Sequence, residues 1–482
     1  MNHPIAGLIL AVCCLSFMTE SRATEAAAPF AAKTVAERDA ALQALENERR
    51  SPETAMTLAT WQALSSIERF GQALHRHGFR SPRITLLPLL RLPVPENATP
   101  ETMTYETWRS TLAELVADLD KAKSMLADIP DDAEIGIDVD LNALRFDLNS
   151  DGLLDESESV AVIFQAISGP QRRGRTARAQ TNDDTQSSPL SPSFRFDRAD
   201  GYWLQGYANF VSANARMWLA HDFSKTFDTS FQMFFPGAGM AAAAPDRADV
   251  ARQKINAQIR RNPYLGLEFA ETEEAKQRLS REIEALPASR QQRLERDAKM
   301  AMMLYQRELR GTGNGGLNSE IFDAISLIHT VNWPLADADA RAGIRLDLLE
   351  MVRLSRLNWR SIQAETDNER EWLPGPQQPG PHPLTTLEVS GETVAAWHDA
   401  LDLFENALEG RILLPHIRFA DRGFNLKRFF DEPTPFDLVL TITGPGAQPY
   451  LETGSVASNR DWRELTRAFG RNGFWSYAIW FN

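Results

Sequence analysis

Apolar residues recur at intervals of three and four over long stretches of this chain, and that spacing predicts a helical body. The clearest stretch opens at Ser51-Pro52, where serine suits a helix cap and proline suits the first turn, and it ends at Gly78. Its apolar positions are Met56, Trp61, Leu64, Ile67, Phe70 and Leu74. Comparable patterns occur near four further positions: Thr34, Trp108, Trp203 and Trp397. We therefore expect a mainly α fold, built as a multi-helix body.

Two kinds of segment interrupt the helical pattern. Residues 169–195 lack an apolar period and are basic, then polar, then proline-rich, which predicts a flexible linker. This linker would separate an N-terminal helical region, residues 24–168, from a C-terminal helical region, residues 196–482. Near the end of the chain, DLVLTI (437–442) and WSYAIWF (475–481) are typical of short strands. The C-terminal region is therefore expected to end in a small β element.

The first residues of the chain indicate export. An uncharged apolar run, IAGLILAVCCLSFM, is too short to span a bilayer comfortably but matches the core of a signal peptide. Small residues at Ser21 and Ala23 predict cleavage after residue 23, with an uncleaved anchor as the alternative. We expect residues 1–23 to be a signal peptide and the mature protein to be periplasmic or secreted. No other apolar run approaches the length of a membrane span.

Composition argues against several kinds of site and partner in the mature chain. Both cysteines, Cys13 and Cys14, lie in the signal segment, so disulfides, thiolate metal sites and cysteine nucleophiles are not expected after cleavage. The formal net charge of −14 disfavours nucleic acid and anionic membranes as partners. The same net negative charge favours the binding of divalent cations.

One segment carries a specific chemical pattern: residues 147–158, DLNSDGLLDESE, which we call the acidic loop. Ca²⁺ takes six to eight oxygen ligands from a chain that wraps around it, with oxygen side chains at loop positions 1, 3 and 5 and a bidentate glutamate at position 12. Glycine at position 6 allows the sharp turn. A capping box at the start of a helix, formed by Asp155 and Glu158, is the alternative interpretation, but it explains only two of the matching positions.

The acidic loop resembles the calcium-binding loop of the EF-hand family, over roughly residues 141–168. The resemblance implies one bound Ca²⁺ and a set of six ligand residues: Asp147, Asn149, Asp151, Leu153, Asp155 and Glu158. Leu153 would contribute its carbonyl, and Glu158 would lie in the first turn of an exiting helix. The entering side has room for barely two helical turns, and the sequence has no second loop of this kind.

The function that follows is calcium binding by an exported protein. We expect a single Ca²⁺ held structurally, and a binding or scaffold body whose ligand the sequence does not identify. The alternative is a calcium-stabilised periplasmic hydrolase with an unidentified active site, because no catalytic residues can be assigned from the sequence. A concave pocket that joins carboxylates or histidines of shifted pKa to a nucleophile would favour the enzyme.

Overall fold

The computed structural model describes residues 26–47, 51–81, 92–160, 162–163, 193–235, 238, 247–270, 272–309, 322, 325–365, 371–378, 389–432, 434–458 and 469. Helices account for most of these residues and the sheets are small and antiparallel, so the mainly α fold predicted from the periodicity is confirmed. None of the helices in this part of the chain is both long and apolar enough to cross a bilayer.

The chain divides into two compact units. The larger unit comprises residues 1–224 and 331–482, and the smaller one is the intervening stretch, Lys225–Thr330. The expected linker at 169–195 lies almost entirely outside the described residues, so its flexibility stays a prediction. The prediction is wrong for its last three residues, 193–195, which belong to strand β2 (Ser193–Phe196) and pair with strand β1 (Ile137–Asp140) in the larger unit.

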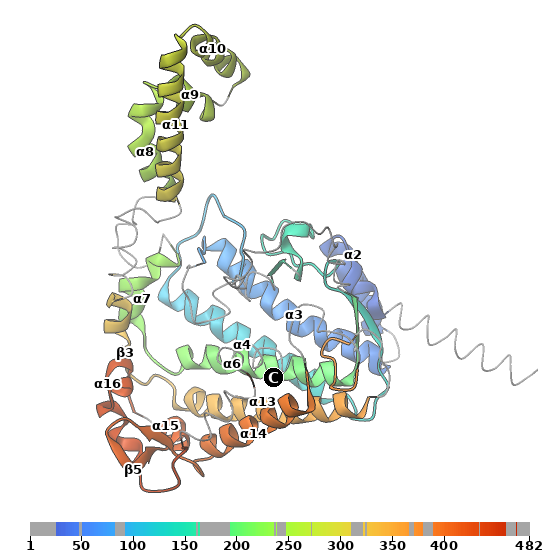
Figure 1. The fold of residues 1–482 in the computed structure, drawn as a ribbon. Coiled ribbons are helices and arrows are strands. Elements are labelled where there is room, and N and C mark those ends of the chain that lie inside the picture. Colours follow the sequence, from blue (N-terminus) through green and yellow to red (C-terminus); the bar gives the residue numbers. More distant parts are fainter. Residues whose placement is uncertain are drawn as a thin grey trace, which may run out of the picture. The chain divides into compact units, whose positions relative to one another are not determined.

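Long helices form a row in the larger unit, and neighbours in the row pack against each other (Figure 1). In order, the row is α3 (Pro52–Arg76), α4 (Tyr105–Ala127), α6 (Arg198–Leu219), α13 (Ala338–Ala364) and α14 (Gly391–Leu408). Each begins at a polar residue whose side chain accepts an amide N–H of the first turn. These caps are Ser51, Thr104, Asp197, Asp337 and Ser390.

The N-terminal segment lies against this row as helix η1 (Ala28–Ala31) and helix α2 (Val35–Asn47). Thr34 Oγ1 accepts the amide N–H of Glu37, and the Glu37 carboxylate accepts the N–H of Lys33. The main core joins this segment to the rest of the unit. Among its buried members are Phe30, Trp61, Leu126, Phe194, Trp359 and Trp397.

The end of the larger unit contains the small β elements, and one strand prediction is wrong there. Strands β4 (Leu414–His416), β5 (Phe419–Phe424) and β7 (Leu451–Glu452) form a three-stranded sheet. Residues 437–442, predicted as a strand, instead fold mainly as helix α16 (Leu438–Thr443). The Asp437 side chain accepts the N–H of Leu440 and caps this helix, and Gly444, with φ of 101°, ends it. The predicted strand at 475–481 lies outside the described residues.

Shorter elements complete the larger unit. Strand β3 (Asn332–Trp333) pairs with β6 (Phe436–Asp437). Helix α15 (Leu426–Asp431) and helix η5 (Pro445–Tyr450) flank the C-terminal strands in the sequence.

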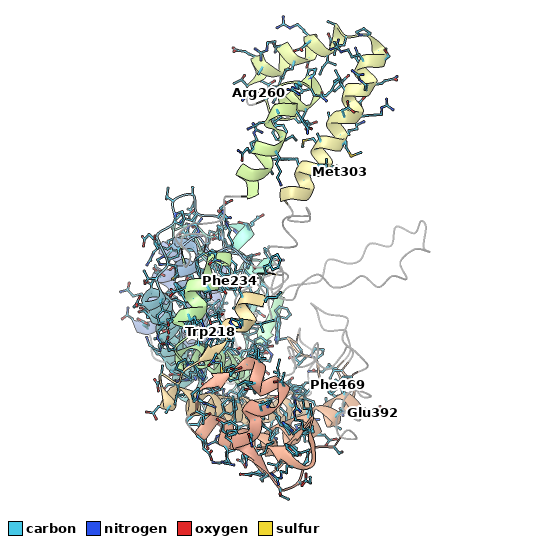
Figure 2. The ribbon with its side chains drawn as sticks, turned by 90° about the vertical axis from the view of Figure 1, so that its left-hand side faces the viewer. Trp218, Phe234, Arg260, Met303, Glu392 and Phe469 are labelled. Atoms are coloured by element: carbon cyan, nitrogen blue, oxygen red, sulfur yellow. The ribbon has the colours of Figure 1, made fainter. Side chains whose placement is uncertain are left out.

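The smaller unit is helical throughout its described residues. Its elements are α7 (Ser224–Ser230, whose first residue ends the larger unit), η4 (Phe231–Met233), α8 (Arg247–Ile259), α9 (Pro263–Glu268), α10 (Glu273–Glu284) and α11 (Ala288–Leu309). One face of α11 packs through Ala298 and Ala301 into a small core. Met300 and Met303 project from the other face, each 56% exposed; Figure 2 labels Met303.

Candidate functional site

The backbone of the acidic loop turns sharply at two points. Gly152 has φ of +82° and Ser150 has φ of +61°, both in the left-handed region. Glycine adopts this conformation at little cost, which explains its place at position 6 of the loop. A side chain at Gly152 would meet no atom within 4 Å, so conformation rather than space requires glycine there.

The predicted ligand residues organise the loop through its own amide groups. The two carboxylate oxygens of Asp147 accept the N–H groups of Asp151, at 3.0 Å, and Gly152, at 3.1 Å. Asn149 Oδ1 also accepts the Asp151 N–H, and Asp151 Oδ1 accepts the N–H of Leu153 at 2.8 Å. These bonds hold the oxygen side chains at positions 1, 3 and 5 around one turn of the backbone.

Glu158, at position 12, turns its carboxylate into the loop. Its side chain is buried, with the residue 2% exposed, and Oε1 accepts the N–H of Leu148 at 2.9 Å. Its other oxygen, Oε2, is buried without a hydrogen-bond partner among the described residues. Burial raises the pKa of Glu158 to about 7, and the negative charges of Asp147, Asp151 and Asp155 add to that effect. A buried acceptor beside three carboxylates is a position that a cation would stabilise.

The remaining ligand positions lie nearer the surface. Asn149 is half-buried, Asp151 and Asp155 are exposed, and Leu153 is exposed as well. The next residue, Leu154, is buried, as expected for position 8. The loop therefore has a buried side formed by Asp147 and Glu158 and a solvent-exposed side formed by Asp151, Leu153 and Asp155.

The segments that flank the loop differ from those of an EF-hand. No helix precedes Asp147; strand β1 ends at Asp140, and turns follow it. Glu158 does not lie in an α-helical turn, because residues Glu156–Glu158 form a 3₁₀ turn and Ser159 is extended. An antiparallel bridge between Arg145 and Ser159 joins the two ends of the loop instead. Of the predicted exiting helix (residues 156–168), the described residues 160, 162 and 163 are helical, and the part beyond 163 lies outside the described residues.

The capping-box interpretation of Asp155 and Glu158 does not describe this geometry. The Asp155 side chain makes no capping hydrogen bond. The Glu158 carboxylate accepts the N–H of Leu148, ten residues earlier in the chain. The alternative interpretation of these two residues as a capping box is therefore not supported.

Two side chains of helix α3 bond to the first residue of the acidic loop, and the sequence pattern did not indicate this. Glu68 Oε1 accepts the Asp147 N–H at 2.6 Å and also accepts from Arg38 Nη1 of α2 at 2.8 Å. Gln72 donates to the Asp147 carbonyl at 2.8 Å. Residues 68 and 72 precede the loop by more than seventy positions, so no local spacing could have revealed them.

A second acidic cluster lies elsewhere in the larger unit. Oxygens of Asp197, Glu365 and Glu371 lie within 4.8 Å of one another, a closer grouping than the acidic loop has among the described residues. Burial, followed by the charge of Asp197, raises the pKa of Asp200 beside them. The Asp200 carboxylate accepts the Asp197 N–H and completes the capping box of α6, so its place beside the cluster has a structural explanation. We assign no ion to this cluster.

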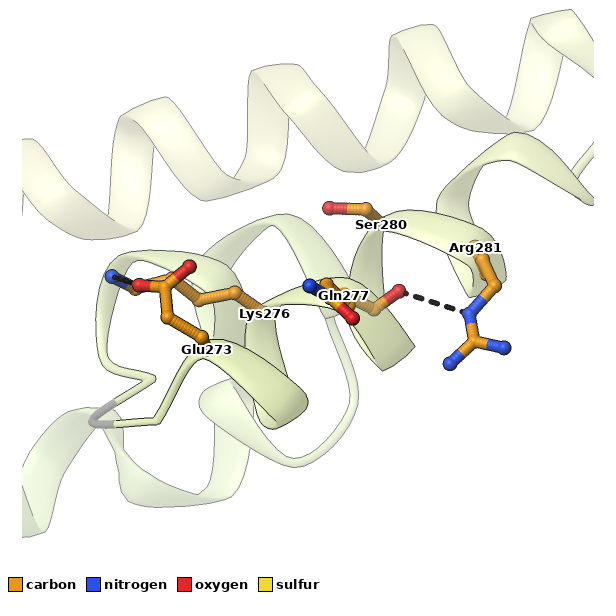
Figure 3. A pocket seen from close by; sticks show the side chains of 5 residues that line it. All are labelled: Glu273, Lys276, Gln277, Ser280 and Arg281. Carbon is orange, nitrogen blue, oxygen red and sulfur yellow. Dashed lines mark hydrogen bonds and ion pairs between the residues drawn. The ribbon is translucent and has the colours of Figure 1, made fainter.

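A groove runs along α10 in the smaller unit (Figure 3). Its lining consists of Glu273, Lys276, Gln277, Ser280 and Arg281. Lys276 pairs with Glu273 at 2.7 Å, and the lining contains no histidine. The lining includes the hydroxyl of Ser280, but no side-chain hydrogen bond among the described residues joins it to Glu273 or Lys276, so the groove gives no support to the hydrolase interpretation.

Comparisons of the chain with known families, with curated proteins and with solved structures find no match.

Proposed function

We propose that this is an exported calcium-binding protein in which the acidic loop holds one Ca²⁺ as a structural ion. The observation that supports this most directly is the buried, unpartnered Oε2 of Glu158 beside the charges of Asp147, Asp151 and Asp155. A buried carboxylate oxygen without a donor is costly unless a cation or a proton neutralises it.

The ligand roles follow from position in the loop. Asp147, Asn149 and Asp151 would supply side-chain oxygens, and Leu153 would supply its carbonyl. Asp155 would bind directly or through a water, and Glu158 would bind with both carboxylate oxygens. The bound ion would neutralise the repulsion among these carboxylates and draw the side chains of the exposed half inward.

The surroundings of the loop favour a structural ion over a switch. Calcium sensors open a pair of helices around the loop and thereby expose an apolar groove. Here a strand and turns precede the loop, and a β-bridge ties its two ends together. Glu68 and Gln72 also hold the first ligand residue to α3, which leaves little that could open.

The rest of the molecule is proposed to be a binding or scaffold body without catalytic activity. Its ligand is not identified by any described site. The alternative, a calcium-stabilised hydrolase, would need a pocket that combines a nucleophile with a base, and the groove along α10 does not provide one.

Thermal unfolding of the full mature chain, with and without calcium, tests the structural role. We expect calcium to raise the melting temperature, with a gain of about 1.4 kcal/mol for each tenfold excess of free ion over the dissociation constant. A dye that fluoresces on apolar surface should report nearly the same signal in both states. Glu158→Gln is the control and should lose most of the calcium-dependent gain.

Two results would contradict this function. If millimolar calcium left the melting temperature unchanged, the loop would not be a calcium site. If calcium caused a large rise in dye fluorescence, the protein would be a sensor and the ion would not be structural.

A further inference from the structure

The acidic loop touches the N-terminal arm of the chain, which we define as residues 26–47 with helices η1 and α2. The N–H of Val35 donates to the Gly152 carbonyl at 3.2 Å. Thr34 and Leu153 form an antiparallel β-bridge at the same place. Gly152 and Leu153 stand between the ligands Asp151 and Asp155, so the arm contacts the backbone that a bound ion would fix.

A second connection runs from the arm to the first ligand residue. Arg38 of α2 and the Asp147 N–H both donate to Glu68 Oε1. Arg38 and Glu68 are buried, with side chains 7% and 5% exposed. Moving the arm away would leave a buried glutamate without its cation, which is costly. The arm is therefore joined to the loop in two places, directly at Gly152 and Leu153 and through Glu68 at Asp147.

The arm covers a tryptophan of the core. Phe30 stacks on Trp61, with ring centroids 5.6 Å apart, and the Arg38 guanidinium lies 5.1 Å from the centre of the same ring. Thr57, also on α3, donates to the Ala26 carbonyl at 3.1 Å. With these contacts in place Trp61 is 2% exposed. Release of the arm would bring the ring into contact with water.

We infer that the calcium loop acts as a latch for the N-terminal arm, so that opening the arm over Trp61 and losing the ion are one coupled event. The inference rests on the proposed calcium function. If the ion binds only the closed state, calcium lowers the open population by the factor 1 + [Ca²⁺]/Kd. The average structure stays closed with or without calcium, and what changes is how often the arm opens.

Amide hydrogen exchange of the full mature chain, in chelator and over a series of calcium concentrations, tests the latch. We expect amides of α2 and of the acidic loop to slow by about tenfold for each tenfold excess of calcium over Kd. Amides of α10 and α11 in the smaller unit serve as the internal reference and should not change. Calorimetry on the same sample reports whether the ion binds at all.

The two failures are distinguishable. If calorimetry detects binding while the α2 amides exchange at an unchanged rate, the latch is wrong and the calcium function stands. If calorimetry detects no binding at millimolar calcium, the proposed function fails and the latch fails with it.

A matched pair of variants isolates the contact between arm and loop. Val35→Pro removes the N–H that donates to Gly152, at the first residue of α2, where a helix tolerates proline. Val35→Ala shortens the same side chain but keeps the N–H. We expect Val35→Pro to bind calcium and to lose most of the calcium-dependent protection of α2, whereas Val35→Ala retains it. Equal protection in the two variants would overturn the role of this contact.

Discussion

At the scale of single residues, Glu158 combines burial with negative charge. One oxygen is occupied by the Leu148 N–H, and the other has no donor among the described residues. Without a metal ion, the least costly way to keep such a group buried is to leave it protonated. This explains why burial raises its pKa to about 7, far above the ordinary value of 4.5.

The stability of the metal-free protein should therefore fall as the pH rises through this range. Between about 4.5 and about 7, folded Glu158 keeps a proton that the unfolded chain has already released. The contribution is thus fully present below the unfolded pKa and is lost as the pH approaches the folded pKa. Denaturant unfolding in chelator, followed from about pH 5 to about pH 8, measures this slope.

Calcium and one substitution provide the controls for the pH dependence. Calcium favours the ionised carboxylate, so saturating calcium should abolish or reverse this part of the slope. Glu158→Gln cannot titrate and should lack it. If chelator-treated Glu158→Gln showed the same slope as the natural sequence, another group would be responsible.

Residue spacing predicts a set of ligand residues, which stays a prediction, and it does not reveal how these residues are packed in the fold. Oxygen side chains at alternating positions and the glycine at position 6 identify the loop, and the positive φ of Gly152 agrees with that expectation. The pairing of Glu158 with Leu148, and of Glu68 with Asp147, depends on how distant segments pack. Neither contact leaves a local pattern in the sequence.

At the scale of elements, the Arg38–Glu68 pair attaches α2 to α3. Breaking a buried ion pair by removing one partner is strongly destabilising, because the other charge stays buried without compensation. Arg38→Met keeps much of the side-chain volume and should cost about 3 kcal/mol of unfolding free energy. Denaturant unfolding of the full mature chain measures the loss.

A double variant separates charge from packing. Glu68→Gln removes the charge but keeps an oxygen that can accept the Asp147 N–H. Arg38→Met combined with Glu68→Gln should therefore be more stable than Arg38→Met alone. If the double variant were less stable than either single one, lost packing over Trp61 rather than the unpaired charge would explain the effect.

The boundaries of helices could be predicted best from the sequence. The conformation of short apolar segments could be predicted least well. Ser51-Pro52 and Gly78 mark the two ends of α3 because capping depends on local chemistry. Residues 437–442 are rich in β-branched side chains, yet they form α16, in which Val439, Leu440 and Ile442 are exposed. The Asp437 cap prevails there over intrinsic strand preference, which depends strongly on context.

At the scale of the whole molecule, the division into units does not follow the sequence in a simple way. The smaller unit, Lys225–Thr330, interrupts the larger one between α6 and α13. Both units are built from helices with the same apolar period, so periodicity cannot indicate which helices share a core. The proline-rich and polar segment at 169–195 was the clearest break in the pattern, yet its last three residues belong to β2, which pairs with β1 in the same unit.

The acidic loop belongs to the larger unit, in which the start of α2 and two side chains of α3 contact it. The proposed function requires that a single Ca²⁺ binds at residues 147–158. Calorimetric titration of the full mature chain with calcium, and separately with magnesium, tests it most directly. We predict one Ca²⁺ per chain with Kd of about 10⁻⁴–10⁻³ M, much weaker binding of Mg²⁺, and a sharp loss of affinity in Glu158→Gln. An absence of calcium heat at millimolar ion, or calcium binding that Glu158→Gln leaves unchanged, would contradict it.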